Sequence, residues 1–197
     1  MAERLKEVVR EPQNTVVYAM PRGGVVLGYE IAKALKCPLS LVITRKIGHP
    51  HSPEYAIGVV TEEGETIFNE EEIKLVDQTW LKEELKNQRE EAKRRRDVYL
   101  GGKKPISAEG KTAIIVDDGV ATGLSLFLAV KKIKKEKPKR LIVAIPVAPK
   151  DTALRLKKEV NELVAMLIDE NYLGAVGAYY QEFNQVEDRE VIDLLSR

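Results

Sequence analysis

Short apolar runs alternate with helix-length amphipathic segments along most of this 197-residue chain, and that alternation is the feature that most constrains its fold. The runs that predict buried strands are residues 16–20, 39–44, 112–116, 141–145 and 163–168, and the segments with helical spacing are residues 25–35, 70–98, 124–135 and 151–159. Strands that alternate with helices form parallel sheets covered by helices. We therefore predict an α/β fold with an open, mostly parallel sheet flanked by helices.

The remaining segments complete a single predicted domain. Gly48, Pro50 and Pro53 predict a loop over residues 45–55, and residues 56–61 and 66–68 predict a hairpin. Asn69 is the predicted N-cap of the long helix at 70–98. We expect a core at about 14–168, a flexible loop at 45–69, a short strand at 176–180, and a small hood formed partly by 169–197.

Composition excludes several classes of partner. Lys plus Arg is 32 and Asp plus Glu is 31, so the formal charge of +1 provides no bulk attraction to nucleic acid or an anionic membrane. The apolar runs are too short to cross a bilayer, and the polar N-terminus does not resemble a signal peptide. Cys37 is the only cysteine, which favours a reducing compartment. We expect a cytoplasmic protein with no nucleic-acid or membrane partner, and we interpret the basic runs at 94–96 and 103–104 as solvated.

The stretch IIVDDGVATGLS at 114–125 carries the strongest chemical signal. It places Asp117 and Asp118 at the carboxyl end of a strand, where ligands sit in open α/β sheets. Thr122, Gly123 and Ser125 follow at the start of a helix, whose free N–H groups favour an anion. Groups that donate hydrogen bonds to a phosphate therefore lie beside carboxylates that accept hydrogen bonds from hydroxyl groups. A phosphorylated sugar presents both kinds of group. The chain lacks a P-loop and a G-x-G-x-x-G motif, so a nucleoside triphosphate or a dinucleotide is not the ligand expected at this motif.

This stretch resembles the phosphoribosyl diphosphate (PRPP) motif of type I phosphoribosyltransferases. The resemblance implies a type I phosphoribosyltransferase-like, Rossmann-like fold, in which Asp117 and Asp118 hold the ribose hydroxyls. The 5′-phosphate would be wrapped by Ala121, Thr122, Gly123, Leu124 and Ser125. Leu124 stands where the family pattern has glycine, and Ser125 where it has threonine. An ordinary strand–loop–helix junction with an acidic N-cap remains the structural alternative.

Two further segments resemble the family's diphosphate-binding elements. In YAMPRGG, Arg22 would meet the diphosphate, Gly23 and Gly24 would form an anion nest, and the Pro21–Arg22 peptide would be cis. A plain glycine-rich turn between a strand and a helix is the alternative. Arg45 and Lys46 follow the next predicted strand and would reach the same oxygens. Mg²⁺ would be carried in with PRPP and make few direct bonds to the protein. We predict no metal site in the protein itself, because His49 and His51 have no third ligand nearby.

The sequence contains fewer residues that indicate the acceptor. The stretch TRKIGHPHSPEY resembles the adenine-type closing loop, in which Glu54 would be the acid or base for a base nitrogen; a solvated carboxylate is the alternative. Ala121 stands where 6-oxopurine enzymes place an aspartate, which argues against a hypoxanthine–guanine mechanism. The C-terminal aromatics Tyr172, Tyr179, Tyr180 and Phe183 would stack on an acceptor base or pack the hood.

The resemblance implies an enzyme that binds PRPP and Mg²⁺ and transfers phosphoribose to a small-molecule acceptor, with a nucleobase as one candidate, releasing pyrophosphate. Asp117, Asp118 and Glu54 are the predicted catalytic residues. The alternative is a PRPP-binding regulatory protein without turnover. PRPP synthetases share a similar acidic motif but are longer. We expect a homodimer with the helix at 70–98 as a contact.

Overall fold

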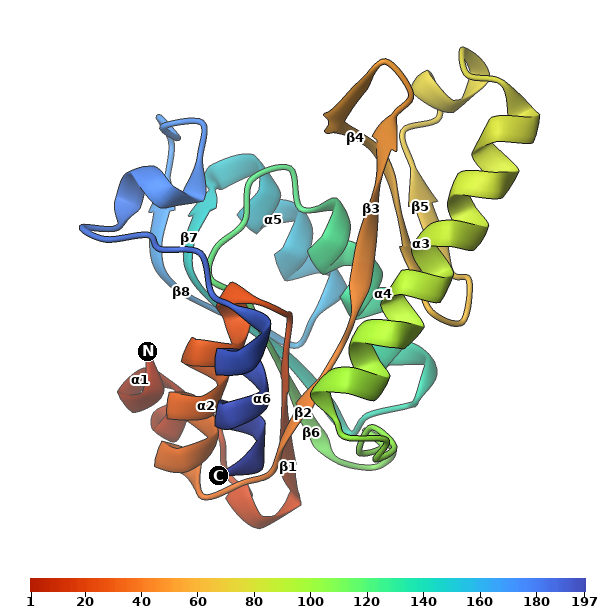
Figure 1. Ribbon diagram of the computed structural model, residues 1–197. Coiled ribbons are helices and arrows are strands. Elements are labelled where there is room, and N and C mark those ends of the chain that lie inside the picture. Colours follow the sequence, from red (N-terminus) through yellow and green to blue (C-terminus); the bar gives the residue numbers. More distant parts are fainter.

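The computed structural model describes all 197 residues and contains two β-sheets (Figure 1). The larger sheet has five strands in the order β2-β1-β6-β7-β8, and every neighbouring pair in it is parallel. Its strands are β1 (Thr15–Ala19), β2 (Leu39–Leu41), β6 (Thr112–Val116), β7 (Arg140–Pro149) and β8 (Glu162–Asp169). The predicted α/β class and mostly parallel sheet are confirmed.

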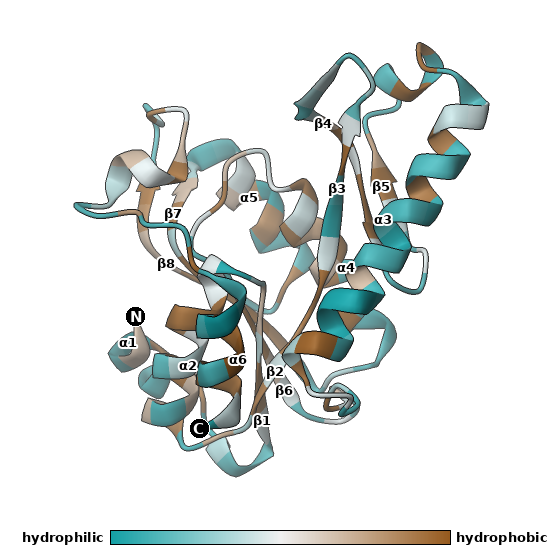
Figure 2. Ribbon diagram, viewed as in Figure 1, coloured by the Kyte–Doolittle hydropathy of each residue, from teal (hydrophilic) through white to brown (hydrophobic).

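Helices cover both faces of this sheet. Strands β1 and β6 are buried, as is most of β7, whereas the edge strand β8 leaves Met166, Leu167 and Ile168 exposed, so the expected burial of the run at 163–168 is wrong. The helices are α1 (Ala2–Val8), α2 (Gly23–Leu35), α3 (Gln78–Tyr99), α4 (Leu124–Lys135), α5 (Lys150–Glu159) and α6 (Asp188–Ser196). No helix combines the length and the apolar character that a membrane span requires. Figure 2 shows the apolar residues concentrated on the central strands, whereas α3 is largely hydrophilic along its length.

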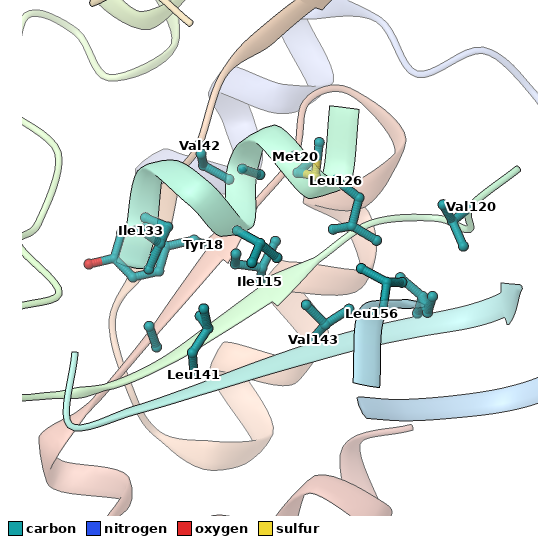
Figure 3. Close-up of a cluster of buried hydrophobic side chains, with 14 of the residues drawn as sticks. Tyr18, Met20, Val42, Ile115, Val120, Leu126, Ile133, Leu141, Val143 and Leu156 are labelled. Carbon is teal, nitrogen blue, oxygen red and sulfur yellow. The ribbon is translucent and has the colours of Figure 1, made fainter. Parts of the chain in front are cut away.

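Successive side chains of each strand point to opposite faces of the sheet, so the core is divided into two clusters. Tyr18 and Ile115 belong to the cluster that α4 and α5 cover, whereas Val17 and Ile114 belong to the cluster beneath α1 and α2. Figure 3 shows the first cluster, where side chains of α4 such as Leu126 lie against those of the strands. Burial of each large apolar side chain contributes about 1.5–3 kcal/mol. This packing fixes the carboxyl ends of β1 and β6 beside the start of α4.

The predicted loop at 45–55 is wrong, because all of these residues except the turn at 50–51 lie in two strands. A second, three-stranded antiparallel sheet contains β3 (Thr44–His49), β4 (Ser52–Thr61) and β5 (Thr66–Phe68), so most of the expected loop at 45–69 consists of strands, and the predicted hairpin of 56–61 with 66–68 is part of this sheet. Ile47 and Ile57 are fully buried between this sheet and the start of α3. The register shifts on either side of Gly48, where an added Cβ would lie 2.2 Å from the oxygen of Pro53. The glycine permits this close approach within the hairpin rather than ending the strand.

The long helix begins later than predicted. Asp77 rather than Asn69 is the N-cap of α3, and its side chain accepts a hydrogen bond from the N–H of Trp80 at 2.8 Å. Asn69 instead accepts from the N–H of Glu71 at 3.2 Å, within a turn that precedes a short 3₁₀ helix (Glu72–Lys74). The predicted helix at 70–98 is therefore a turn, a 3₁₀ helix and then α3.

The C-terminal part also differs from the prediction. Residues Val176–Tyr179 form a 3₁₀ helix instead of a strand. Helix α6 is not among the predicted elements, and its Val191 is fully buried against the core beside Val25 and Leu41. The hood formed partly by 169–197 stays a prediction. Figure 1 shows the segment before α6 on one side of the carboxyl ends of the parallel strands, with α3 and the second sheet on the other side.

Candidate functional site

Two adjoining cavities lie at the carboxyl ends of β1 and β6, with volumes of about 680 and 660 Å³. Lys46, Asp117, Asp118 and Ser125 line both of them. The larger cavity is also lined by predicted diphosphate residues, namely Arg22, Gly23 and Arg45. The smaller is also lined by Glu54 and by the predicted phosphate loop at 121–124. The structure therefore brings together nearly all of the side chains that the sequence singled out.

Gly24 is the exception. It is buried and lines neither cavity, and an added Cβ would lie 2.7 Å from the main-chain oxygen of Val116. This glycine lets α2 pack closely on the end of β6. The prediction for this residue concerns its main-chain N–H group rather than a side chain, so the anion nest of Gly23 and Gly24 stays a prediction beside this packing role.

The two carboxylates form a partly buried acidic pair. The N–H of Asp118 donates a hydrogen bond to Oδ1 of Asp117 at 3.0 Å. Burial raises the pKa of Asp117 well above its ordinary value, and the neighbouring charge of Asp118 raises it further. Burial also raises the pKa of Asp118, while the positive charge of Lys46 opposes both shifts. Such a pair gains from a ligand that donates hydrogen bonds to it.

The loop after β1 packs directly on this pair. A Cβ added to Gly23 would lie 1.8 Å from Oδ2 of Asp118, so only glycine leaves room for that carboxylate. The Pro21–Arg22 peptide bond is cis, as the resemblance implied. The Nη1 atom of Arg22 lies 3.5 Å from Oδ1 of Asp188 at the start of α6. The loop is thus held between β6 and the C-terminal helix.

One face of α3 supplies site residues that sequence reasoning missed. Arg95, Gln88 and Glu84 line the larger cavity. The Nε–H of Arg45 donates to Oε1 of Gln88 at 2.9 Å, and Arg95 pairs with Glu91 at 2.8 Å. Burial lowers the pKa of the Arg45 guanidinium. Their helical spacing was the available signal, but the side of α3 that faces the sheet is set by tertiary packing.

The larger cavity is consequently rich in positive charge. Arg22, Arg45, Lys46 and Arg95 all line it, together with the carboxylates of Glu84, Asp117 and Asp118. Arg95 belongs to the basic run at 94–96, and the interpretation of that run as solvated is wrong for this residue. The cluster suits a ligand with several negative charges, such as a diphosphate.

The phosphate-loop segment is held from behind by α5. Gly123 has φ = 85° at the N-cap of α4, and an added Cβ would lie 2.9 Å from the ring of Phe127. The hydroxyl of the buried Thr152 donates to the main-chain oxygen of Ala121 at 2.9 Å. Helix α4 begins at Leu124, so its first N–H groups face the smaller cavity. The geometry is that of an anion site at a helix N-terminus.

The hairpin tip contributes exposed residues. Glu54 is exposed in the smaller cavity beside Tyr55, whose hydroxyl donates to Oε1 of Glu72 at 2.9 Å. His49 lines the larger cavity, and its ring centroid lies 5.6 Å from that of His51. No group of three or more His, Cys, Asp or Glu side chains is arranged to hold a metal ion.

The segment at 176–180 contacts the acidic loop, which consists of residues 117–119, at two points. The hydroxyl of Tyr180 donates to the main-chain oxygen of Asp118 at 2.5 Å, and Val176 packs on Gly119. Burial, followed by the nearby charge of Asp118, raises the pKa of Tyr180 to about 12. Tyr172 and Tyr179 stack on each other at 5.4 Å. Tyr180 is therefore the aromatic residue that contacts the site loop directly.

The chain belongs to the phosphoribosyl transferase domain family, whose model matches residues 1–182. Two curated Mycobacterium tuberculosis proteins, Rv0571c and MT0597, both named "Putative phosphoribosyl transferase", are each 32% identical over 199 aligned residues, which include all of this chain. The chain spans 44% of the length of each of these curated proteins. The crystal structure of TT1426 from Thermus thermophilus is similar, with 38% identity and a TM-score of 0.78 over 98% of this chain and 91% of that one. The resemblance found in the sequence is confirmed at the level of the family.

Proposed function

We propose that this protein binds PRPP across the two cavities and transfers its phosphoribose to a small-molecule acceptor, releasing pyrophosphate. One observation carries the proposal: Asp117 and Asp118 line both cavities, with a cation-rich space on one side and a helix N-terminus on the other. PRPP has the matching order of groups, with a ribose between a diphosphate and a terminal phosphate.

The 5′-phosphate occupies the smaller cavity in this proposal. The N–H groups at the start of α4 and the hydroxyls of Thr122 and Ser125 are its donors. Leu124 is compatible with this role, because main-chain N–H groups bind the phosphate. The carboxylates of Asp117 and Asp118 accept hydrogen bonds from the ribose hydroxyls, which satisfies a buried acidic pair.

The diphosphate occupies the larger cavity. Arg22, Arg45, Lys46 and Arg95 neutralise its negative charge. The same groups stabilise the additional charge that develops on the pyrophosphate as it leaves. The donor set fits Mg²⁺ that is bound mainly by diphosphate oxygens, with Asp117 and Asp118 as the neighbouring carboxylates. Bound there, Mg²⁺ would supply further neutralisation of the leaving group.

The acceptor enters beside Glu54. This carboxylate lines the smaller cavity from the hairpin β3–β4, where it would accept or donate a proton at the acceptor nitrogen. The hairpin and the segment at 176–180 stand on opposite sides of the acidic loop and would shield the reacting carbon from water. A nucleobase as the acceptor, a homodimeric state and a cytoplasmic location stay predictions.

The competing function is a PRPP sensor that binds without turnover. Pyrophosphate release separates the two: the protein is incubated with PRPP, Mg²⁺ and a panel of nucleobases, and PRPP binding is measured in parallel. Base-dependent release supports transfer, whereas tight PRPP binding without release supports the sensor. Asp118→Asn should weaken PRPP binding strongly, and an unchanged affinity would contradict the site assignment in either case.

A further inference from the structure

A third cavity of about 640 Å³ lies outside the proposed PRPP site, between α4, α5 and strand β5. Its apolar lining consists of Ile67, Leu124, Phe127 and Val130. The volume falls within the range of small-molecule sites, which are commonly apolar cavities with a few polar groups. Neither the proposed reaction nor the fold accounts for this hollow.

The rest of its lining is positively charged apart from Glu159. The cations are Lys131, Lys134, Lys135, Arg155 and Lys158. Two of these lysines are paired with carboxylates, Lys134 with Glu159 at 2.6 Å and Lys135 with Glu65 at 2.8 Å. Lys131, Arg155 and Lys158 have no carboxylate within ion-pair distance. Like charges that surround one hollow repel one another unless an anion lies between them.

The apolar floor and the cationic rim together restrict the ligand. The guanidinium of Arg155 lies 4.6 Å from the ring centroid of Phe127, and guanidinium and ring planes are surfaces on which a planar base stacks. The three unpaired cations carry more positive charge than one phosphate neutralises, which favours a ligand with several phosphates. Inorganic polyphosphate has no apolar part to contact the apolar residues of the cavity, so it would leave them exposed. We propose that this cavity binds a nucleoside triphosphate, with the base on the Phe127 side and the phosphates between Lys131, Arg155 and Lys158.

This second site shares part of its wall with the phosphate loop. Leu124 and Arg155 line both this cavity and the smaller cavity of the proposed PRPP site. Two polyanions that approach Arg155 from its two sides repel each other and compete for its charge. A bound nucleotide therefore weakens PRPP binding, and PRPP weakens nucleotide binding by the same factor. This coupling rests on the proposed function, whereas nucleotide binding itself does not.

The test is calorimetric titration of the full chain with ATP and with GTP, in the absence of PRPP. We expect saturable binding to the native chain. In the double variant Lys131→Glu/Lys158→Glu the affinity should fall about tenfold or more, because two side chains that attract the phosphates are replaced by side chains that repel them. The matched control is Lys157→Glu/Lys82→Glu, which reverses two exposed lysines outside the cavity and should bind as the native chain does. Circular dichroism of both variants checks that they are folded.

Several results would overturn the proposal. Nucleotide binding that is absent, or equal in the two double variants, would remove the site. Equally tight binding of inorganic tripolyphosphate would show that the apolar floor is not used, and tighter binding of single-stranded RNA would assign the face to nucleic acid. For the coupling, ATP should raise the Kd of PRPP in the native chain and less so in Lys131→Glu/Lys158→Glu; an equal rise in both would place ATP in the PRPP site itself.

Discussion

Arg22 and Asp188 are 166 positions apart in the chain, yet Nη1 of the arginine lies 3.5 Å from Oδ1 of the aspartate. The hydroxyl of Tyr99 donates to the same Oδ1 atom at 2.7 Å. The loop that follows β1 is thereby tied to the end of α3 and the start of α6. A residue that faces the proposed diphosphate space thus already has a carboxylate partner.

This relationship predicts that Asp188→Asn tightens PRPP binding. The aspartate competes with the diphosphate for Arg22 and adds a negative charge near it, whereas the amide oxygen still accepts the hydrogen bond of Tyr99. We expect the Kd of PRPP to fall several-fold, with a loss of stability under about 1 kcal/mol because the pair is partly exposed. Asp193→Asn on the same helix has no ion pair to remove and should change neither quantity. A higher Kd in Asp188→Asn would show instead that the aspartate orients Arg22 for binding.

A second prediction concerns two adjacent arginines of α3. Arg94 and Arg95 both pair with Glu91, at 2.7 and 2.8 Å, but only Arg95 lines the larger cavity. We expect Arg95→Gln to raise the KM for PRPP about tenfold, since a charged partner of a diphosphate is lost. Arg94→Gln is the matched control and should leave KM within about twofold, because exposed ion pairs contribute little. Equal effects of the two substitutions would contradict the assignment of Arg95 to the site.

The parts of the site that the sequence predicted are those built within one strand–loop–helix unit. Asp117 and Asp118 follow an apolar run, and residues 121–125 open a helix, so local order alone places them together. Arg95 was missed because its role depends on which face of α3 packs on the second sheet. Helical spacing predicts a face but not the element that it meets.

The hairpin and the C-terminal helix show two different limits. Glycine and prolines at 48–53 are ordinarily breakers, yet the buried Ile47 and Ile57 keep this segment in strands through pairing that is not local. The spacing of Val191, Leu194 and Leu195 in α6 was available in the sequence. Its contact with the loop at Arg22 was not, since that contact joins opposite ends of the chain.

A third prediction uses two glycines of α2 to separate the site from the fold. In Gly23→Ala, the new Cβ would lie 1.8 Å from Oδ2 of Asp118, so the carboxylate must move. We expect PRPP binding to weaken at least about tenfold, because a displacement of this size disrupts a positioned ligand group. In Gly28→Ala the Cβ would lie 2.7 Å from that of Ala19, and overpacking should cost about 1–3 kcal/mol of stability. Isothermal calorimetry below the melting temperature should show native PRPP affinity for Gly28→Ala; affinity lost equally in both would mean that the effect is on folding.

The last prediction follows from the raised pKa of Asp117, which burial and then the charge of Asp118 cause. A carboxyl whose folded pKa is above its unfolded value binds more protons in the folded state, so ionisation destabilises the fold as pH rises through that window. The cost is absent below an unfolded pKa of about 3.9 and complete above the raised folded pKa. Asp117→Asn removes this cost, and its amide oxygen still accepts from the N–H of Asp118. We expect a gain of about 1 kcal/mol in unfolding free energy at neutral pH that disappears near pH 4, together with weaker PRPP binding.

Urea unfolding between pH 4 and pH 8 measures this gain. Asp169 is the matched control, because the hydrogen bond from Tyr179 lowers its pKa, so its contribution to stability is present above the unfolded pKa and lost as pH falls. Asp169→Asn should therefore destabilise the protein at neutral pH and have less effect as the medium becomes acidic, which is the opposite trend. If Asp117→Asn instead destabilised the fold at neutral pH, Lys46 would outweigh burial at this carboxylate. The acidic pair would then stabilise the fold. The cost of burying its charge would no longer be a reason for it to bind the ribose hydroxyls.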